Sequence, residues 1–196
     1  MLSFALAVLF LIITPGPGVL SVAGVGSGYG AGPGSRYIAG LWVGTNLVAL
    51  VVVSGMATIL LANAQIRTML LLASIGYLVF LALKIAFAGA RIAFGETARS
   101  PGFWDGIALQ AVNPKAYAVN TTLFTGFAFL PDNLGGETLI KFLIMNVIWL
   151  PIHFAWLFLG ISLHRLNLAP RAQRRINIAM ALSMLCVVAL ALLAPK

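Results

Sequence analysis

The chain has 196 residues, of which 61% are hydrophobic and only 8% are charged, and its formal net charge is +8. Soluble globular domains are about half apolar and about a quarter charged, so this composition excludes an ordinary water-soluble fold and indicates an integral membrane protein. The single cysteine, Cys186, excludes a disulfide within the chain and the chemistry of paired cysteines, and it is expected to pack as a small apolar residue.

Six apolar stretches follow one another along the chain, at about residues 2–25, 37–62, 68–90, 106–130, 138–163 and 176–194. Each exceeds the roughly 17–20 residues that an α-helix needs to cross a ~30 Å hydrocarbon layer. We therefore predict an all-α integral membrane protein with six transmembrane helices.

The first apolar stretch is interrupted by the sequence TPGPG at Thr14–Gly18. In a helix interior, proline costs about 3 kcal/mol and glycine about 1 kcal/mol relative to alanine. Proline is favoured at the first position of a helix, so either Thr14-Pro15 or Gly16-Pro17 can start a second helix here. The first transmembrane helix is predicted to be broken at this point.

A glycine occupies every second position from Gly24 to Gly34. The run contains neither of the glycine motifs that bind nucleotide phosphates, so we expect a flexible cytoplasmic connection. Gly40 and Gly44 then form a GxxxG pattern, which permits a close helix approach. The partner helix is expected either within one chain or in a second copy of a homodimer.

The fourth apolar stretch contains a second break, at Asn113-Pro114-Lys115. Asparagine is a strong N-cap, so this sequence predicts a helix that restarts inside the membrane. Paired, interrupted spans in corresponding halves are typical of transporters built from inverted repeats. We predict one transmembrane transporter domain over residues 1–196, with repeats at about 1–90 and 103–196. The six helices then form an inverted 3+3 repeat whose first and fourth helices are broken.

Helix length places both breaks at a similar depth in the membrane, where they can face one cavity. Each restart leaves backbone N–H groups and the positive end of a helix dipole, which together attract an anion, and Lys115 adds a full positive charge. The alternative is that the prolines only kink two packed helices. The predicted substrate-binding residues are Thr14, Pro15, Gly16, Pro17, Asn46, Asn113, Pro114, Lys115 and Asn120.

Polar side chains within spans are candidates for function, although each can instead form a hydrogen bond between helices. His153 is the candidate for proton coupling, with a packed, hydrogen-bonded histidine as the alternative. No Asp or Glu falls in the middle of a span, which favours a substrate with no extra positive charge. The substrate's ammonium group is expected to meet unwound backbone carbonyls or an aromatic face such as Tyr77 or Trp42. No metal site and no cofactor is predicted.

The positive charges are unevenly divided between the two sides of the predicted membrane. Seven arginines fall in the connections after the first, third and fifth spans, whereas three lysines and arginines fall on the other side. The positive-inside rule places the arginine-rich connections in the cytoplasm and both chain termini in the periplasm. The basic surplus therefore reflects topology. Membrane lipid is an expected partner, and nucleic acid is not.

Four segments resemble the LysE/RhtB family of amino-acid exporters: TPGPG at Thr14–Gly18, Gly28–Gly44, Ile75–Lys84 and NPKA at Asn113–Ala116. The resemblance covers nearly the whole chain. It implies a multi-pass transporter of the bacterial inner membrane that exports amino acids or related metabolites, as an antiporter that uses the proton gradient, and not an enzyme. Gly18 stands where the family usually has Asn, and Ala82 replaces a frequent glycine. Both differences can alter the shape of the cavity, so the resemblance does not identify the substrate of this protein.

The expected function is export of a small-molecule substrate, a neutral amino acid or a related small carboxylate. Two alternatives remain open from the residues. One is a transporter of another metabolite or an ion, although His153 and His164 lie near no further metal ligands in the sequence. The other is a membrane scaffold or assembly protein that transports nothing.

Overall fold

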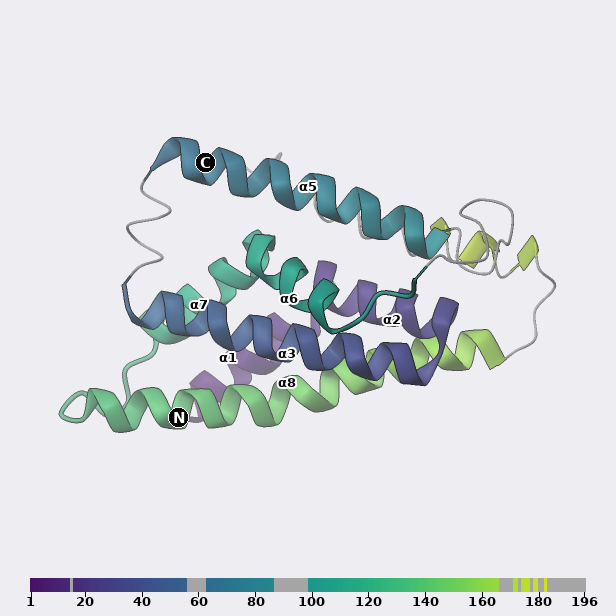
Figure 1. Ribbon diagram of the computed structural model, residues 1–196. Helices are drawn as coiled ribbons and strands as arrows, with labels where there is room; N and C mark the ends of the chain where they lie inside the picture. The colour runs from purple at the N-terminus through teal and green to yellow at the C-terminus, as the bar shows by residue number, and fades with distance from the viewer. Residues whose placement is uncertain are drawn as a thin grey trace.

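Figure 1 shows the computed structural model of the protein, which describes residues 1–14, 16–55, 63–86 and 99–165, together with residues 171–172, 174–176, 178–179 and 182. Across this part of the chain the regular structure is entirely α-helical, as predicted. The helices are α1 (Leu2–Ile13), α2 (Pro17–Tyr29), α3 (Ala31–Val53), α5 (Ala64–Ala86), α6 (Phe103–Val112), α7 (Pro114–Gly126) and α8 (Leu134–Arg165).

The described helices account for part of the predicted membrane topology. The helix α3 and residues Leu134–Leu163 of α8 are each long and apolar enough to cross a membrane. The pair α1 and α2, bent by 51°, makes a third candidate if it is taken as one broken span. Of the sixth predicted stretch, 176–194, only four residues are described, so the count of six and the inverted repeat stay predictions.

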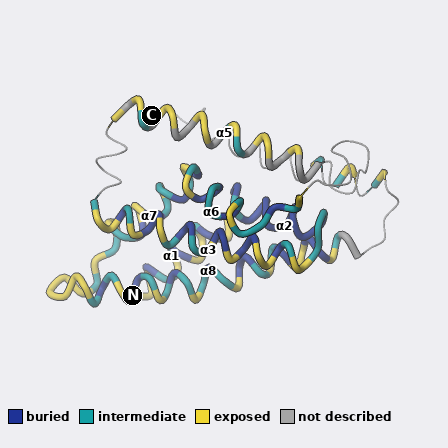
Figure 2. The backbone as a smooth tube through the Cα atoms, viewed as in Figure 1, coloured by how far each residue is buried: buried dark blue, intermediate teal, exposed yellow. Residues whose placement is uncertain are grey.

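The outer surface of the bundle carries many large apolar side chains. Leu2, Phe10, Leu72, Val147 and Phe158 are each more than 60% exposed. They lie on α1, α5 and α8, whereas α2 and much of α3 are buried (Figure 2). An apolar surface spread over several helices is unfavourable in water but suits a lipid environment, so the protein is membrane-embedded.

The glycine run does not form the flexible connection that its composition predicts. The helix α2 continues to Tyr29 and α3 begins at Ala31, so Gly30 alone separates them. Gly30 has a φ of 80°, a conformation that L-residues with a side chain rarely adopt. The expectation of a flexible loop was wrong because most of these glycines lie within helices, and at least Gly26 serves helix packing: a Cβ there would lie 2.8 Å from the carbonyl oxygen of Leu157.

The GxxxG pattern does mark a close helix approach, and it lies within the chain. The helix α3 packs along α6, and α2 packs along α8. A Cβ added at Gly40 would overlap the backbone of Phe103, and one added at Gly106 would lie 2.5 Å from the carbonyl oxygen of Tyr37. The absence of side chains at these two positions therefore lets the backbones of α3 and α6 touch.

A buried ion pair joins three segments at the end of the bundle that holds the start of α8. The Lys141 ammonium lies 2.8 Å from the carboxylate of Glu137, and the two side chains are 3% and 5% exposed. Glu137 also accepts hydrogen bonds from the backbone N–H groups of Phe129 and Leu130, at 2.7 and 2.5 Å. Lys141 donates to the carbonyl of Phe124 at 3.0 Å. The pair therefore ties α7 and the connection that follows it to α8.

We expect Lys141→Met to lower the melting temperature of the purified protein by several degrees. The substitution leaves the Glu137 carboxylate without its cation in a place shielded from water, and removing one partner of such a pair is destabilising. The double variant Glu137→Gln/Lys141→Met should recover part of the loss, because no charge is then left unpaired. A melting temperature equal to that of the wild type for Lys141→Met would show that the pair is as weak as an exposed one.

Candidate functional site

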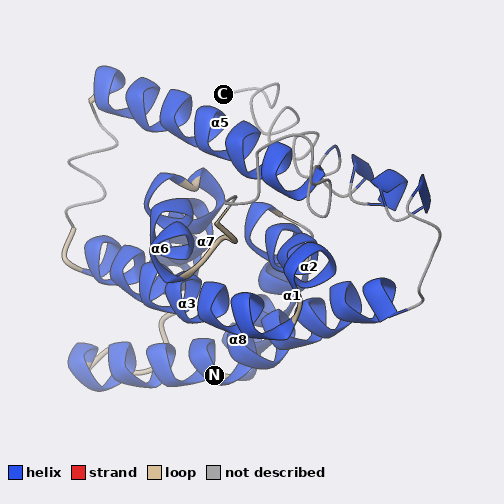
Figure 3. Cartoon of the chain, turned by 45° about the vertical axis from the view of Figure 1, so that its right-hand side comes forward, coloured by secondary structure: helices blue, strands red, loops and turns tan. Residues whose placement is uncertain are grey.

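The two predicted breaks meet inside the bundle (Figure 3), where the pairs α1–α2 and α6–α7 lie between α5 and α8. In the first break, Gly16 has extended backbone and is the N-cap of α2, and Pro17 is the first residue of that helix. The ammonium of Lys115, from the second break, donates a hydrogen bond to the carbonyl of Thr14 at 2.6 Å. Residues 101 positions apart are thus in direct contact.

The second break is organised by Asn113. Its side-chain oxygen accepts the backbone N–H of Lys115 at 3.1 Å, which is the N-cap that the sequence predicted for α7. Its amide nitrogen donates to the side-chain oxygen of Gln110 at 3.0 Å. Both side chains are buried at 4% exposure, so the break is held rigidly between α6 and α7.

A cavity of about 60 Å³ lies where the two breaks meet. At roughly 10–15 Å³ for each water, this is room for about four to six waters, or for a ligand of a few heavy atoms. Its lining combines polar groups with an apolar wall. The lining residues are Leu11, Ile12, Thr14, Gly16, Gly18, Val19, Thr45, Gln110, Asn113, Lys115, Ala116, Val119, Asn120, Met145, Trp149 and His153.

One side of the cavity is positive. The absence of a side chain at Gly16 leaves room for the side chain of Lys115, because a Cβ at Gly16 would lie 2.8 Å from the Lys115 Cδ. The backbone N–H groups of Gly18 and Val19 belong to the first turn of α2, where an α-helix supplies no carbonyl of its own to its N–H groups. An ammonium group, the N–H groups of the first turn of α2 and the positive end of its helix dipole together form a site that suits a carboxylate.

His153 lies on α8 and also lines the cavity. Its Nδ1 lies 2.9 Å from the carbonyl of Trp149, and its ring stacks on that indole with centroids 3.4 Å apart. A carbonyl can only accept, so Nδ1 carries the proton in the neutral ring and Nε2 carries the lone pair. A Cβ at Gly18 would lie 3.7 Å from Nε2, which places this nitrogen beside the start of α2.

Part of the remaining wall is apolar, and none of it carries a negative charge among the described residues. Leu11, Val119 and Met145 line it together with the indole of Trp149. Among the described residues that line the cavity there is no Asp or Glu. The site can therefore neutralise a negative group of a ligand, but it offers no carboxylate to a second positive group.

Six of the predicted site residues line this cavity: Thr14, Gly16, Asn113, Lys115, Asn120 and His153. Pro17 and Pro114 are the first residues of α2 and α7 and shape the site through the backbone. Pro15 lies outside the described residues. The two helix breaks, the N-cap Asn113 and the positive charge of Lys115 therefore lie at one cavity. The sequence predicted that the two breaks can face one cavity.

Asn46 lies elsewhere, in a hydrogen-bonded cluster between α3 and α8. Its side-chain amide pairs in both directions with that of Asn146, at 3.0 and 2.9 Å, and the indole N–H of Trp42 donates to Asn146 at 2.5 Å. Neither asparagine lines the cavity. Tyr77, an expected partner for an ammonium group, instead donates to the carbonyl of Asp105 at 2.7 Å. These residues join helices and do not face the cavity.

Gln110 and Trp149 line the cavity without having been predicted from the sequence. Gln110 is three residues before Asn113, and Trp149 is four residues before His153. Residues at these spacings share a helix face, so each could have been found from its predicted neighbour.

The family model of LysE type translocators matches residues 9–195 of the chain. No curated protein and no solved structure matches the chain at a significant level. The family match includes both breaks and every residue that lines the cavity. The chain therefore belongs to the LysE type translocator family, whose members are membrane transporters rather than enzymes.

Proposed function

We propose that the protein is a secondary transporter that exports small carboxylate-bearing metabolites, and neutral amino acids in particular. The observation that carries this proposal is the contact between Lys115 and the carbonyl of Thr14, at the meeting point of two helix starts. A carboxylate that enters the cavity can replace the Thr14 carbonyl as the partner of Lys115. Gly18 and Val19, whose N–H groups belong to the first turn of α2, line the same cavity.

The chemistry of the cavity narrows the substrate. With no Asp or Glu in its described lining, a second positive group on the substrate would be desolvated without compensation. The wall formed by Leu11, Val119 and Met145 suits an uncharged side chain. Half-helix starts that face an anionic group are a recurring way in which transporters bind substrate near the middle of the membrane.

His153 is the proposed proton-coupling residue. Hydrogen bonding to Trp149 leaves the lone pair on Nε2, next to Gly18 at the start of α2. Imidazole is the side chain whose ordinary pKa lies in the physiological range. A proton on Nε2 and a carboxylate at Lys115 would occupy the same cavity, which offers a physical route for coupling substrate movement to the proton gradient.

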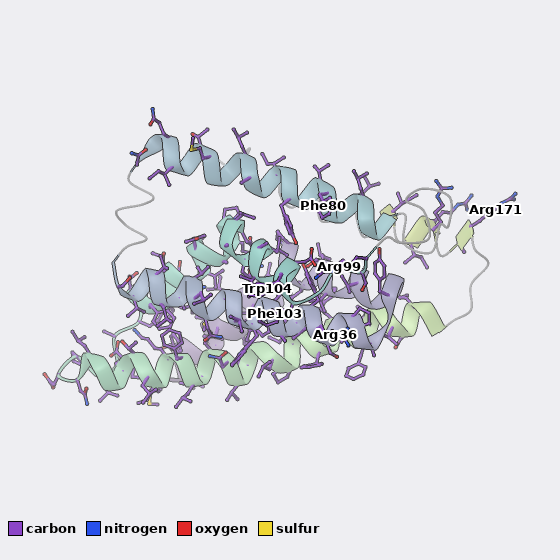
Figure 4. The ribbon with its side chains drawn as sticks, viewed as in Figure 1. Arg36, Phe80, Arg99, Phe103, Trp104 and Arg171 are labelled. Atoms are coloured by element: carbon purple, nitrogen blue, oxygen red, sulfur yellow. The ribbon has the colours of Figure 1, made fainter. Side chains whose placement is uncertain are left out.

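The proposed location is the bacterial inner membrane, with six helices in an inverted 3+3 arrangement and both termini in the periplasm. The distribution of positive charge supports this orientation. Arg36, Arg99 and Arg171 lie at the same end of the bundle in the view of Figure 4. By the positive-inside rule this end faces the cytoplasm.

Ligand-dependent thermal stability of the purified protein tests the proposal. A ligand that binds only the folded state stabilises it by about 2.7 kcal/mol at a hundredfold excess over its dissociation constant. We expect neutral amino acids to raise the melting temperature, and vesicles that hold the protein to release the same amino acids faster than empty vesicles do. If no amino acid or small carboxylate stabilises the protein or is transported, the proposal is wrong and a scaffold role is favoured.

Transport of a metal ion is the alternative to transport of an amino acid. Within the described residues no group of three or more His, Cys, Asp or Glu side chains is placed to hold a metal ion. Lys115 would also repel a cation from the cavity. The same stability screen, run with divalent cations, separates the two classes.

A further inference from the structure

Asn120 lies on α7 and lines the cavity, and it is 2% exposed. Its amide nitrogen donates to the carbonyl of Ala116, one turn earlier on the same helix, at 2.8 Å. Its oxygen, Oδ1, is the one buried side-chain nitrogen or oxygen atom without a hydrogen-bond partner in the part of the chain that the structure describes. A residue of the cavity lining therefore carries a buried acceptor that no described group of the protein satisfies.

The orientation of this amide is determined by its neighbour. Exchanging the nitrogen and oxygen would put Oδ1 against the Ala116 carbonyl, where two acceptors would repel each other. The nitrogen must therefore face the helix, which leaves the oxygen without a partner on a residue that lines the cavity. Buried polar atoms in folded proteins are nearly always paired, so an exception beside a cavity indicates a group that is satisfied by a ligand.

Resting on the proposed function of the cavity, we propose that Asn120 Oδ1 accepts a hydrogen bond from the α-ammonium group of the substrate. Lys115 and the start of α2 would hold the carboxylate of the same molecule. Asn120 follows Lys115 by five residues on α7, a rise of about 7.5 Å along the helix, and the long Lys115 side chain lies between the two breaks. The two groups can thus contact opposite ends of one small zwitterion.

This subsite would select for N–H donors without using charge. An amide oxygen accepts a hydrogen bond from an ammonium group but carries no net charge, in agreement with a cavity whose described lining has no carboxylate. A site built around a hydrogen-bonding group rejects analogues that lack the matching group, because its own polar atom is then left unpaired. The predicted ligand class is an α-amino acid, and the corresponding carboxylic acid without the amino group should bind poorly.

Paired ligands provide the test. Each neutral aliphatic amino acid is compared with its des-amino acid, beginning with L-valine and 3-methylbutanoate, by titration of the melting temperature of the purified protein. We expect the wild type to bind the amino acid at least tenfold more tightly. The Asn120→Leu variant, which has a similar volume but no acceptor, should bind both members of the pair with nearly equal affinity. The control, Thr122→Val, changes an exposed residue of α7 that does not line the cavity, and it should keep the wild-type preference.

The outcomes separate this inference from the proposed function. If neither member of any pair binds, the proposed function fails and this inference fails with it. If the wild type binds both members equally well, or Asn120→Leu keeps the tenfold preference, the Asn120 subsite is wrong while the carboxylate site stands. The comparison of ligands on the wild type needs no variant, so the inference can be overturned even if Asn120→Leu does not fold.

Discussion

Replacing Lys115 with methionine is expected to reduce export to the level of empty vesicles while the protein remains folded. Methionine keeps much of the apolar stem but removes the ammonium that contacts the Thr14 carbonyl. A hydrogen bond to a charged group contributes about 1.5–3 kcal/mol, so substrate affinity should fall roughly 10- to 150-fold. The measurements are ligand-dependent melting temperature and release of the amino acid from loaded vesicles.

The matched control is Arg36→Met, which removes one positive charge from an exposed position on α3 outside the cavity. This variant should bind and export like the wild type, which separates a local effect of Lys115 from an effect of net charge. Unchanged affinity and export in Lys115→Met would refute the assignment of the carboxylate to this site. A folded Lys115→Met protein that binds but does not export would place the role of Lys115 in movement rather than in binding.

The features that could be predicted from the sequence are those decided by local chemistry. Proline cannot donate a backbone hydrogen bond and asparagine favours the N-cap, so the helix starts at Pro17 and Pro114 follow from the residues themselves. The prediction that the two breaks lie close together required only their corresponding positions in the sequence and the expected helix lengths. The hydrogen bond from Lys115 to the Thr14 carbonyl shows that the two breaks are in contact.

The features that could not be predicted depend on which helix lies opposite. Asn46 has the same polarity and a similar expected depth as the cavity residues, but Asn146 lies across from it and satisfies its amide. For Asn120 the reverse holds, because no described residue donates a hydrogen bond to its side-chain oxygen. From a single sequence we can predict that a residue is able to form a hydrogen bond. Whether another residue of the protein is its partner depends on how the helices pack.

The structure of the glycine run also depends on which helix lies opposite. A regular glycine spacing from Gly24 to Gly34 is compatible with a flexible loop and with closely packed helices. What decides between them is the presence of a neighbouring backbone, such as the Leu157 carbonyl beside Gly26. The GxxxG pattern at Gly40 was more informative because small residues one turn apart have few other uses in a membrane helix.

Gly40→Ala is expected to destabilise the protein, although alanine is the better helix former. The added Cβ would overlap the Phe103 backbone, which is part of the helix start of α6 and cannot move aside as a side chain can. Overpacking of this kind typically costs about 1–3 kcal/mol, which exceeds the gain of up to about 1 kcal/mol in helix propensity. The melting temperature should fall by several degrees in Gly40→Ala, and Gly106→Ala should behave similarly because it meets the Tyr37 carbonyl.

The same substitution at Gly32 supplies the control. Gly32 lies in the first turn of α3, is exposed, and has no atom within 4 Å of an added Cβ, so Gly32→Ala should leave the melting temperature unchanged or raise it. Opposite signs for one chemical change on one helix would show that backbone contact, and not helix propensity, decides the result. If Gly40→Ala is as stable as Gly32→Ala, then α3 and α6 do not touch in the membrane as they do here. Because α6 carries Gln110 and leads into Asn113, separation of α3 from α6 should also weaken amino-acid binding, which connects the packing of these glycines to the geometry of the cavity.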